Sequence, residues 1–241
     1  MNTEEANALL MSVDDLGFLS PEKTELLLGA IGAMPPQQKH AAMKKLISPN
    51  TANRIGAGGT NLSPRDEAMM RLGMLPPDIR KGLEDKRLQL VDTVYYTRKS
   101  GAALTALKLI TNADTQLAGT SNLANGMLQK DNYMLLTAIK LVSGTSATGI
   151  NDAVYGVGEK GVVNGEIEFK VNGKYLLPNR TPNKIFDTTN MTNVAPGYYR
   201  LANPKWIDAQ QQIEANLTFS QALAANTFVG IELIGASVTP Y

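Results

Sequence analysis

The chain of 241 residues contains no cysteine, and this absence removes several classes of chemistry. Without thiols there is no disulfide framework, no thiolate metal site and no cysteine nucleophile. Histidine is nearly absent too, since His40 is the only one, in an Ala/Lys-rich stretch that we predict to be helical. We interpret His40 as a helix-surface residue, so no mechanism that needs a histidine pair or a histidine-supported serine triad is expected.

Long apolar runs are also missing. No run approaches the ~20 residues needed to cross a bilayer. The N-terminus lacks a basic segment followed by an apolar stretch, because Glu4 and Glu5 come first and Asp14 and Asp15 interrupt the apolar positions. We therefore expect a soluble protein that is made in a cytoplasm, has no membrane span and carries no classical export signal.

Charge of one sign is not in excess, because 23 Lys and Arg face 22 Asp and Glu, for a formal net charge of +1. The distribution is uneven: residues 1–38 carry one base against six acids (−5), and residues 39–108 carry 13 bases against six acids (+7). This uneven charge distribution is consistent with an acidic arm of one subunit that binds the basic segment of another. It is equally consistent with two helical surfaces that are solvated differently.

The first 62 residues predict a helical arm and a flexible linker. Proline-led breaks at Ser20-Pro21 and Pro35-Pro36 separate three short amphipathic helices, and residues 48–62 are rich in Gly, Asn and Pro. Helices of this length need tertiary burial to persist. We therefore take one apolar residue from each helix as a candidate assembly contact: Leu9, Leu27 and Leu46.

Residues 63–86 predict two more short helices. Ser63-Pro64 and Leu75-Pro76-Pro77 repeat the pattern of a helix start with proline in the first turn. The expected helices cover about 64–73 and 77–86. They complete the helical side of the chain, which ends near Arg87.

Residues 87–241 predict a β body. Asn172-Gly173 between alternating residues indicates a hairpin with a type I′ turn, in which Ile167 and Phe169 face inward. Residues 102–111 fit either a helix or a buried strand, and 178–206 read as an ordered surface loop. Further strands are expected at 87–98, 133–142, 213–219 and 228–234. No helices alternate with these strands, so the pattern favours a sandwich or barrel.

Candidate reaction centres are sparse. The glycine-rich segments at 54–59 and 156–161 lack the Lys-Ser/Thr of a phosphate-binding loop. Glu166 and Glu168 share one strand face, where a solvated surface is the simpler interpretation than a glycosidase or nuclease pair. Asp187 and Asp208 lie outside any repeating metal-ligand pattern. We expect no enzyme activity, no cofactor and no metal.

Two groups remain as binding candidates. The aromatic residues Tyr198, Tyr199 and Trp206 fit either a sugar-stacking platform or a packing and subunit contact. A basic group fits weak contact with nucleic-acid phosphates, although nearby acids dilute it. Its members are Lys81, Lys86, Arg87, Arg98 and Lys99.

The sequence thus predicts an α+β chain: a helical arm and linker (1–62), short helices (63–86), and a mainly antiparallel β-sandwich body (87–241). A helical arm and linker that lead into an Asn/Thr/Gly-rich β body, with strands such as Tyr133–Val142 and Thr227–Ile234, resemble coat proteins of icosahedral bacteriophages with a jelly-roll body. The resemblance implies that the sandwich is a single jelly-roll-like body.

That resemblance implies a self-assembling capsid subunit in the virion, made in the host cytoplasm, whose arms exchange between subunits. Its partners would be copies of itself and other virion proteins, and there are no catalytic residues to carry over. The alternative is a carbohydrate- or receptor-binding β-sandwich that uses Tyr198, Tyr199 and Trp206.

Overall fold

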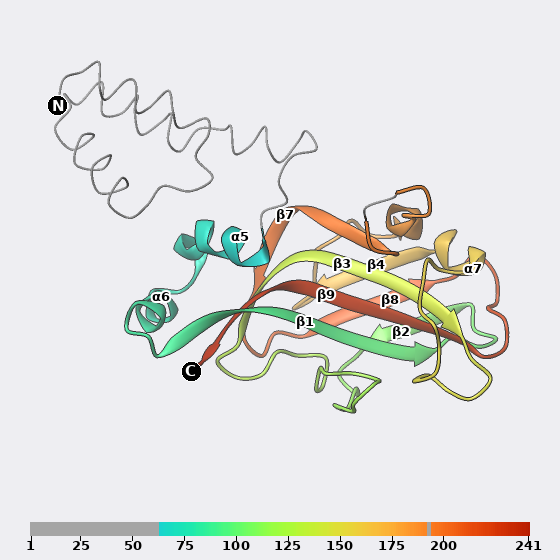
Figure 1. Cartoon of the computed structure of the whole chain (residues 1–241), viewed down its shortest axis with the longest axis horizontal. Helices are drawn as coiled ribbons and strands as arrows, with labels where there is room; N and C mark the ends of the chain where they lie inside the picture. The colour runs from blue at the N-terminus through green and yellow to red at the C-terminus, as the bar shows by residue number, and fades with distance from the viewer. Residues whose placement is uncertain (1–62, 192–193) are drawn as a thin grey trace, which may run out of the picture. The chain divides into compact units, whose positions relative to one another are not determined.

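The computed structural model describes residues 63–191 and 194–241, and Leu62–Tyr241 forms one compact unit (Figure 1). The three predicted arm helices, the 48–62 linker, His40 and the contacts Leu9, Leu27 and Leu46 lie outside the described residues. The described helices are α5 (Pro64–Met70), η2 (Leu72–Met74), α6 (Pro77–Glu84), α7 (Lys160–Val163) and η3 (Asn183–Phe186). The strands are β1 (Leu88–Ser100), β2 (Ala106–Ile110), β3 (Tyr133–Thr145), β4 (Glu166–Val171), β5 (Lys174–Tyr175), β6 (Thr181–Pro182), β7 (Tyr198–Ile207), β8 (Ile213–Thr218) and β9 (Thr227–Pro240).

The strands form two antiparallel sheets that face each other as a sandwich. One sheet has four strands in the order β1-β9-β3-β7, and the other has the order β2-β8-β4-β5, with β6 also paired to β4. Strand β8 pairs with the whole length of one edge of β4. Strands β5 and β6 share the other edge of β4, where they pair at Lys170↔Tyr175 and Ile167↔Thr181. Together β5 and β6 act as one interrupted edge strand.

The strand pairing is nested. β1 pairs with β9, β2 with β8, β3 with β7, and β4 with β5 and β6. Taken in chain order, these strand pairs alternate between the two sheets: the first and third pairs lie in one sheet, and the second and fourth lie in the other. The first half of the chain thus pairs antiparallel with the second half, as in one long hairpin folded over into two sheets. Each sheet therefore contains paired strands that are distant in sequence.

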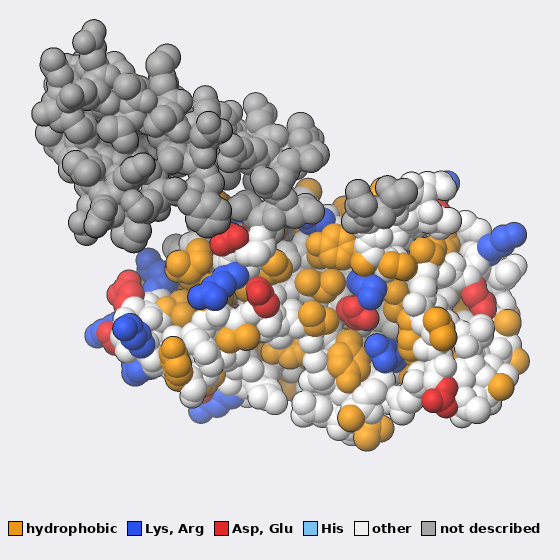
Figure 2. All heavy atoms as spheres, viewed as in Figure 1, with side chains coloured by type: hydrophobic (Ala, Val, Ile, Leu, Met, Phe, Trp, Pro, Cys, Tyr) orange, Lys and Arg blue, Asp and Glu red, His pale blue; other side chains and the backbone are white. Residues whose placement is uncertain are grey.

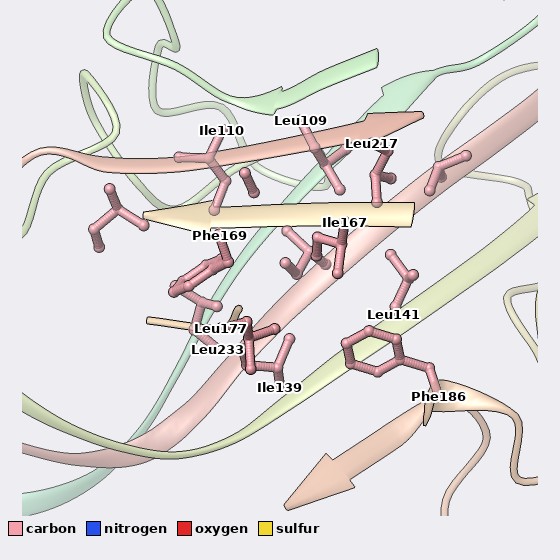
Figure 3. Close-up of a cluster of buried hydrophobic side chains, with 14 of the residues drawn as sticks. Leu109, Ile110, Ile139, Leu141, Ile167, Phe169, Leu177, Phe186, Leu217 and Leu233 are labelled. Atoms are coloured by element: carbon pink, nitrogen blue, oxygen red, sulfur yellow. The ribbon is translucent and has the colours of Figure 1, made fainter. Parts of the chain in front are cut away.

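The core lies between the sheets and is built from alternate residues of each strand. On β4, Ile167, Phe169 and Val171 are buried, while Glu166 and Lys170 are half-exposed on the opposite face. Figure 3 shows Ile167 and Phe169 directed toward side chains of the other sheet. Burial of each such side chain stabilises the fold by about 1.5–3 kcal/mol.

The strand connections gather at two ends of the sandwich. At one end, the Ser220 amide donates to the Gly161 carbonyl at 3.1 Å, and the Ser146 amide donates to the Asn226 carbonyl at 3.2 Å. At the other end, the Gln210 amide donates to the Leu128 carbonyl at 3.2 Å. The described loop residues at the first end are 101–105, 146–165, 187–191, 194–197 and 219–226.

Several local predictions are confirmed. Asn172 and Gly173 have φ values of +49° and +72°, as a type I′ turn requires. The Ser63 hydroxyl caps α5 by accepting from the Asp66 amide at 3.2 Å, and Pro64 is the first helical residue. β1 begins at Leu88, close to the predicted start at 87.

The prediction of a surface loop over 178–206 was wrong, because that segment contains β6, η3 and β7. Two features hide β7 in the sequence. It lies at a sheet edge, where Pro204 is tolerated because no ladder partner is needed on one side. A register shift opposite Leu136 and Ala138 also breaks its alternation. Residues 102–111, which fitted a helix or a strand, contain strand β2.

Candidate interaction surfaces

Helix α5 lies on the outer face of the four-stranded sheet, on the side away from the core. Ala68 is fully buried against Leu135 and Ala236, and the half-buried Leu90 and Trp206 pack around this contact. The indole nitrogen of Trp206 donates to the Arg71 carbonyl at 3.2 Å, just after the end of the helix. These contacts fix α5 on the sheet.

An ion pair sets the orientation of α5. Arg200 of β7 donates through its Nη2 to the Glu67 carboxylate, which is 7% exposed. A second polar contact joins Arg71 to the side-chain oxygen of Asn203 at 3.5 Å. Since α5 has only seven residues, its stability depends on these tertiary contacts.

The predicted aromatic group does not form one platform. Tyr198 and Tyr199 are neighbours on β7 and face opposite sides of the sheet. Tyr199 packs against the core and meets the Phe186 ring edge-on at a centroid distance of 5.7 Å. Trp206 lies on the outer face beside α5. All three lie on a strand and not on a loop.

The predicted basic group is split between the two ends of β1: Lys81, Lys86 and Arg87 precede the strand, and Arg98 and Lys99 lie near its last residue. Arg87 and Arg98 are separated by about 36 Å along an extended strand. Arg98 and Lys99 point to opposite faces, and the Lys99 amine pairs with the buried Asp114 carboxylate at 2.5 Å. Arg87 pairs with Asp85 at 3.6 Å. Lys81, Lys86 and Arg87 therefore do not share a surface with Arg98 and Lys99.

The outer face of the five-stranded sheet is charged and internally paired. Glu168 accepts from Lys170 at 2.5 Å, from the Tyr175 hydroxyl at 3.0 Å and from the Asn216 amide at 3.1 Å. These hydrogen bonds, with that from Lys170 the strongest, lower the pKa of Glu168 to about 2. Glu166 pairs with Arg180 at 2.7 Å. Glu168 thus stays ionised at neutral pH and does not suit the role of a general acid.

The other carboxylates named above serve local structure. Asp187 accepts from the amide and hydroxyl of Thr189, and these bonds lower its pKa. Asp208 accepts from the Gln211 side chain at 2.9 Å. Within residues 63–191 and 194–241, no group of three or more His, Asp or Glu side chains is placed to hold a metal ion. No helix in the same residues is long and apolar enough to cross a membrane.

Exposed apolar side chains occur at separate places on the body. At the first loop end, Val154 is 86% exposed, and Leu104, Met191 and Val194 are also exposed. At the start of the described chain, α5 and η2 expose Met69, Met70 and Met74. Figure 2 shows hydrophobic side chains in several groups over the face that carries β1, β9 and β3, with isolated charges between them. Strand alternation could not reveal the residues named at the loop end and on the helices, since all of those lie outside strands, whereas Val91 and Val94 are exposed on β1 itself.

No protein-family model and no curated protein matches the chain. Among solved structures, the chain is similar to the acidic stable capsid structure of Helicobacter pylori bacteriophage KHP30, at 9% sequence identity and a TM-score of 0.29. The similarity covers 64% of this chain and 94% of that chain.

Proposed function

We propose that this chain is a virion structural protein, a capsid subunit whose body is a single jelly roll. The nested pairing of the strands carries the proposal. Counted with β5 and β6 as one interrupted strand, the body has eight strands in two four-stranded sheets. A long antiparallel hairpin rolled into two such sheets is the jelly-roll topology, which recurs in viral capsid and lectin domains.

The packed core leaves only the outside of the sandwich for contacts with partners. The space between the sheets is filled by apolar side chains such as Leu109, Ile139 and Phe169, all at most 1% exposed. Contacts with partners would therefore use the sheet faces, the loops and the helices. Because fold alone does not determine function, the choice among jelly-roll proteins depends on these outer surfaces.

The exposed apolar side chains favour assembly. They occur at the first loop end around Val154 and Met191, and again on α5 and η2 around Met69 and Met74. A subunit of a closed shell needs contacts on several sides, and buried apolar area is the usual source of their stability. The partners would be copies of this chain and other virion proteins, after synthesis in the host cytoplasm.

The alternative, a carbohydrate- or receptor-binding sandwich, draws no support from its candidate residues. Tyr199 packs against the core, on the opposite face from Tyr198, and Trp206 is half-buried beside α5. A stacking platform needs rings that are exposed on one surface. We therefore keep the capsid subunit as the proposed function.

Sedimentation velocity and electron microscopy of the full chain test this proposal. We expect concentration-dependent formation of closed particles. Val154→Asp should reduce the assembled fraction several-fold, because it places a charge on an exposed apolar side chain at the first loop end. Asn179→Asp adds the same charge at an exposed position between β5 and β6 and should leave assembly unchanged. A chain that stays monomeric at high concentration would contradict the proposal.

A further inference from the structure

Arg98 occupies an unusual place on the outer face of β1. Its side chain passes over Gly230 of β9, where a Cβ would lie 3.2 Å from the Arg98 Cγ. The guanidinium carbon lies 5.2 Å from the ring centroid of Tyr96 and 4.6 Å from that of Tyr155. One cation is thus held against two aromatic rings, which shields it from water.

Both rings are held in place by loops. The Tyr96 hydroxyl accepts from the Gly119 amide at 3.1 Å, and the Tyr155 hydroxyl donates to the Ile150 carbonyl at 3.0 Å. The loop between β2 and β3, which contains Gly119, meets the loop between β3 and α7, which contains Ile150 and Asn151. Gly119 approaches the Asn151 side chain so closely that a Cβ on Gly119 would collide with it. Hydrogen bonds to loop backbone thus hold both rings beside Arg98.

The guanidinium has no hydrogen-bond acceptor among residues 63–191 and 194–241. Its Nε is buried without a partner, and no ion pair there involves Arg98. Neighbouring cations are paired: Lys99 with Asp114 at 2.5 Å, and Lys140 with Glu232 at 3.1 Å. Contacts with ring faces use none of the five N–H donors of arginine. The two Nη groups of Arg98, which are not among the buried unpaired atoms, thus remain available for a ligand.

These features specify the chemistry of the ligand. A planar fork of donors matches a carboxylate, which accepts two parallel hydrogen bonds. Nucleic-acid backbones are held by several unpaired cations, whereas this part of the face offers one, because Lys140 is neutralised by Glu232 and Lys99 points to the opposite face. We propose that Arg98, Tyr96 and Tyr155 form a carboxylate-binding site, and that in the assembly a neighbouring copy presents the carboxylate. The second part rests on the proposed function.

Acetate is the probe for the site itself. In the ¹⁵N-labelled full chain, below the concentration at which it associates, the Nε–H resonance of Arg98 is identified by its loss in Arg98→Lys. We expect it to shift saturably with sodium acetate and not with sodium chloride at equal ionic strength. The Nε–H of Arg180, already bound to Glu166 at 2.7 Å, is the matched control. If Arg98 responds no more than Arg180, or if chloride reproduces the shift, the site is overturned.

Assembly assays test whether a neighbouring copy presents the carboxylate to Arg98. Saturating acetate should reduce the assembled fraction of the unaltered chain about tenfold relative to chloride, and this arm does not depend on a variant that folds. Arg98→Gln should do the same, whereas Arg180→Gln should not. Acetate binding without any effect on assembly would overturn the neighbour as the source of the carboxylate. If the chain never assembles, the proposed function and the neighbour fail together, and the resonance titration alone decides the site.

Discussion

At the scale of single residues, Glu168 shows how an exposed sheet face is held in order. Three donors from β4, β5 and β8 converge on its carboxylate: Lys170, Tyr175 and Asn216. The Lys170 amine also lies 4.7 Å from the centroid of the Tyr175 ring. The cluster ties the short strand β5 to the sheet, at a place where two backbone pairings alone would hold it.

The depressed pKa of Glu168 predicts a pH dependence. Its pKa falls from an ordinary value of 4.5 to about 2 in the folded chain, so the ionised carboxylate stabilises the fold above pH 4.5. This stabilisation is lost as the pH falls from 4.5 through about 2. We expect Glu168→Gln to destabilise the chain at pH 6, and the difference from the unaltered chain to shrink toward pH 2. Urea unfolding at several pH values measures it, and a difference that is constant with pH would contradict the assignment.

At the scale of elements, α5 is held on the sheet by side chains of β7. α5 is too short to persist alone, and β7 is an edge strand with an irregular register. Trp206 and Arg200 of β7 hold α5 through the Arg71 carbonyl and the Glu67 carboxylate. In return, α5 covers the outer face of the sheet at Leu135 and Ala236. The stability of α5 therefore depends on β7.

Substitution of Trp206 tests this dependence. Trp206→Ala removes the packing against Ala68 and leaves the Arg71 carbonyl without its donor, so we expect a loss of about 2 kcal/mol, below the range for fully buried aromatic residues. Amides of α5 should exchange faster with deuterium. Trp206→Phe keeps most of the apolar contact and should cost about half as much. Unchanged protection of α5 in Trp206→Ala would show that other contacts hold the helix.

At the scale of the whole molecule, the nested pairing joins the two ends of the body. β1 and β9 pair along Leu88–Ser100, although more than a hundred residues separate them in sequence. Such long-range contacts make loop closure expensive and folding slow. They also mean that the body closes only when its last strand is in place. Leu62–Tyr241 is accordingly one compact unit with its own core.

Deletion of residues 1–47 separates folding from assembly. Because the body has its own core, we expect the truncated chain to keep its sheet content and a cooperative thermal transition. The predicted arm would dock on neighbouring copies, so the truncated chain should form at least tenfold fewer particles. Circular dichroism and sedimentation velocity measure the two effects. If the truncated chain does not fold, the arm belongs to the core.

Elements with a short-range physical cause could be predicted from the sequence. The Asn172-Gly173 turn, the capped start of α5 at Ser63 and the strand at Tyr133 depend on residues within a few positions of each other. β7 was missed because Pro204 and a register shift disguise it, and its strand character comes from pairing with β3. Local preference cannot show a partner that is distant in sequence.

The candidate sites follow the same division. By itself, the sequence determined that the chain lacks thiols and has one histidine, and that an antiparallel β body with a hairpin at Asn172 follows its helical residues. Only the tertiary structure decided that Trp206 serves α5, that Lys99 is neutralised by Asp114, and that Arg98 lies between Tyr96 and Tyr155 without a carboxylate partner among the described residues. The reason is physical. Alternation along a strand determines which face a side chain takes, but its partners come from loops and strands that only the folded chain brings together.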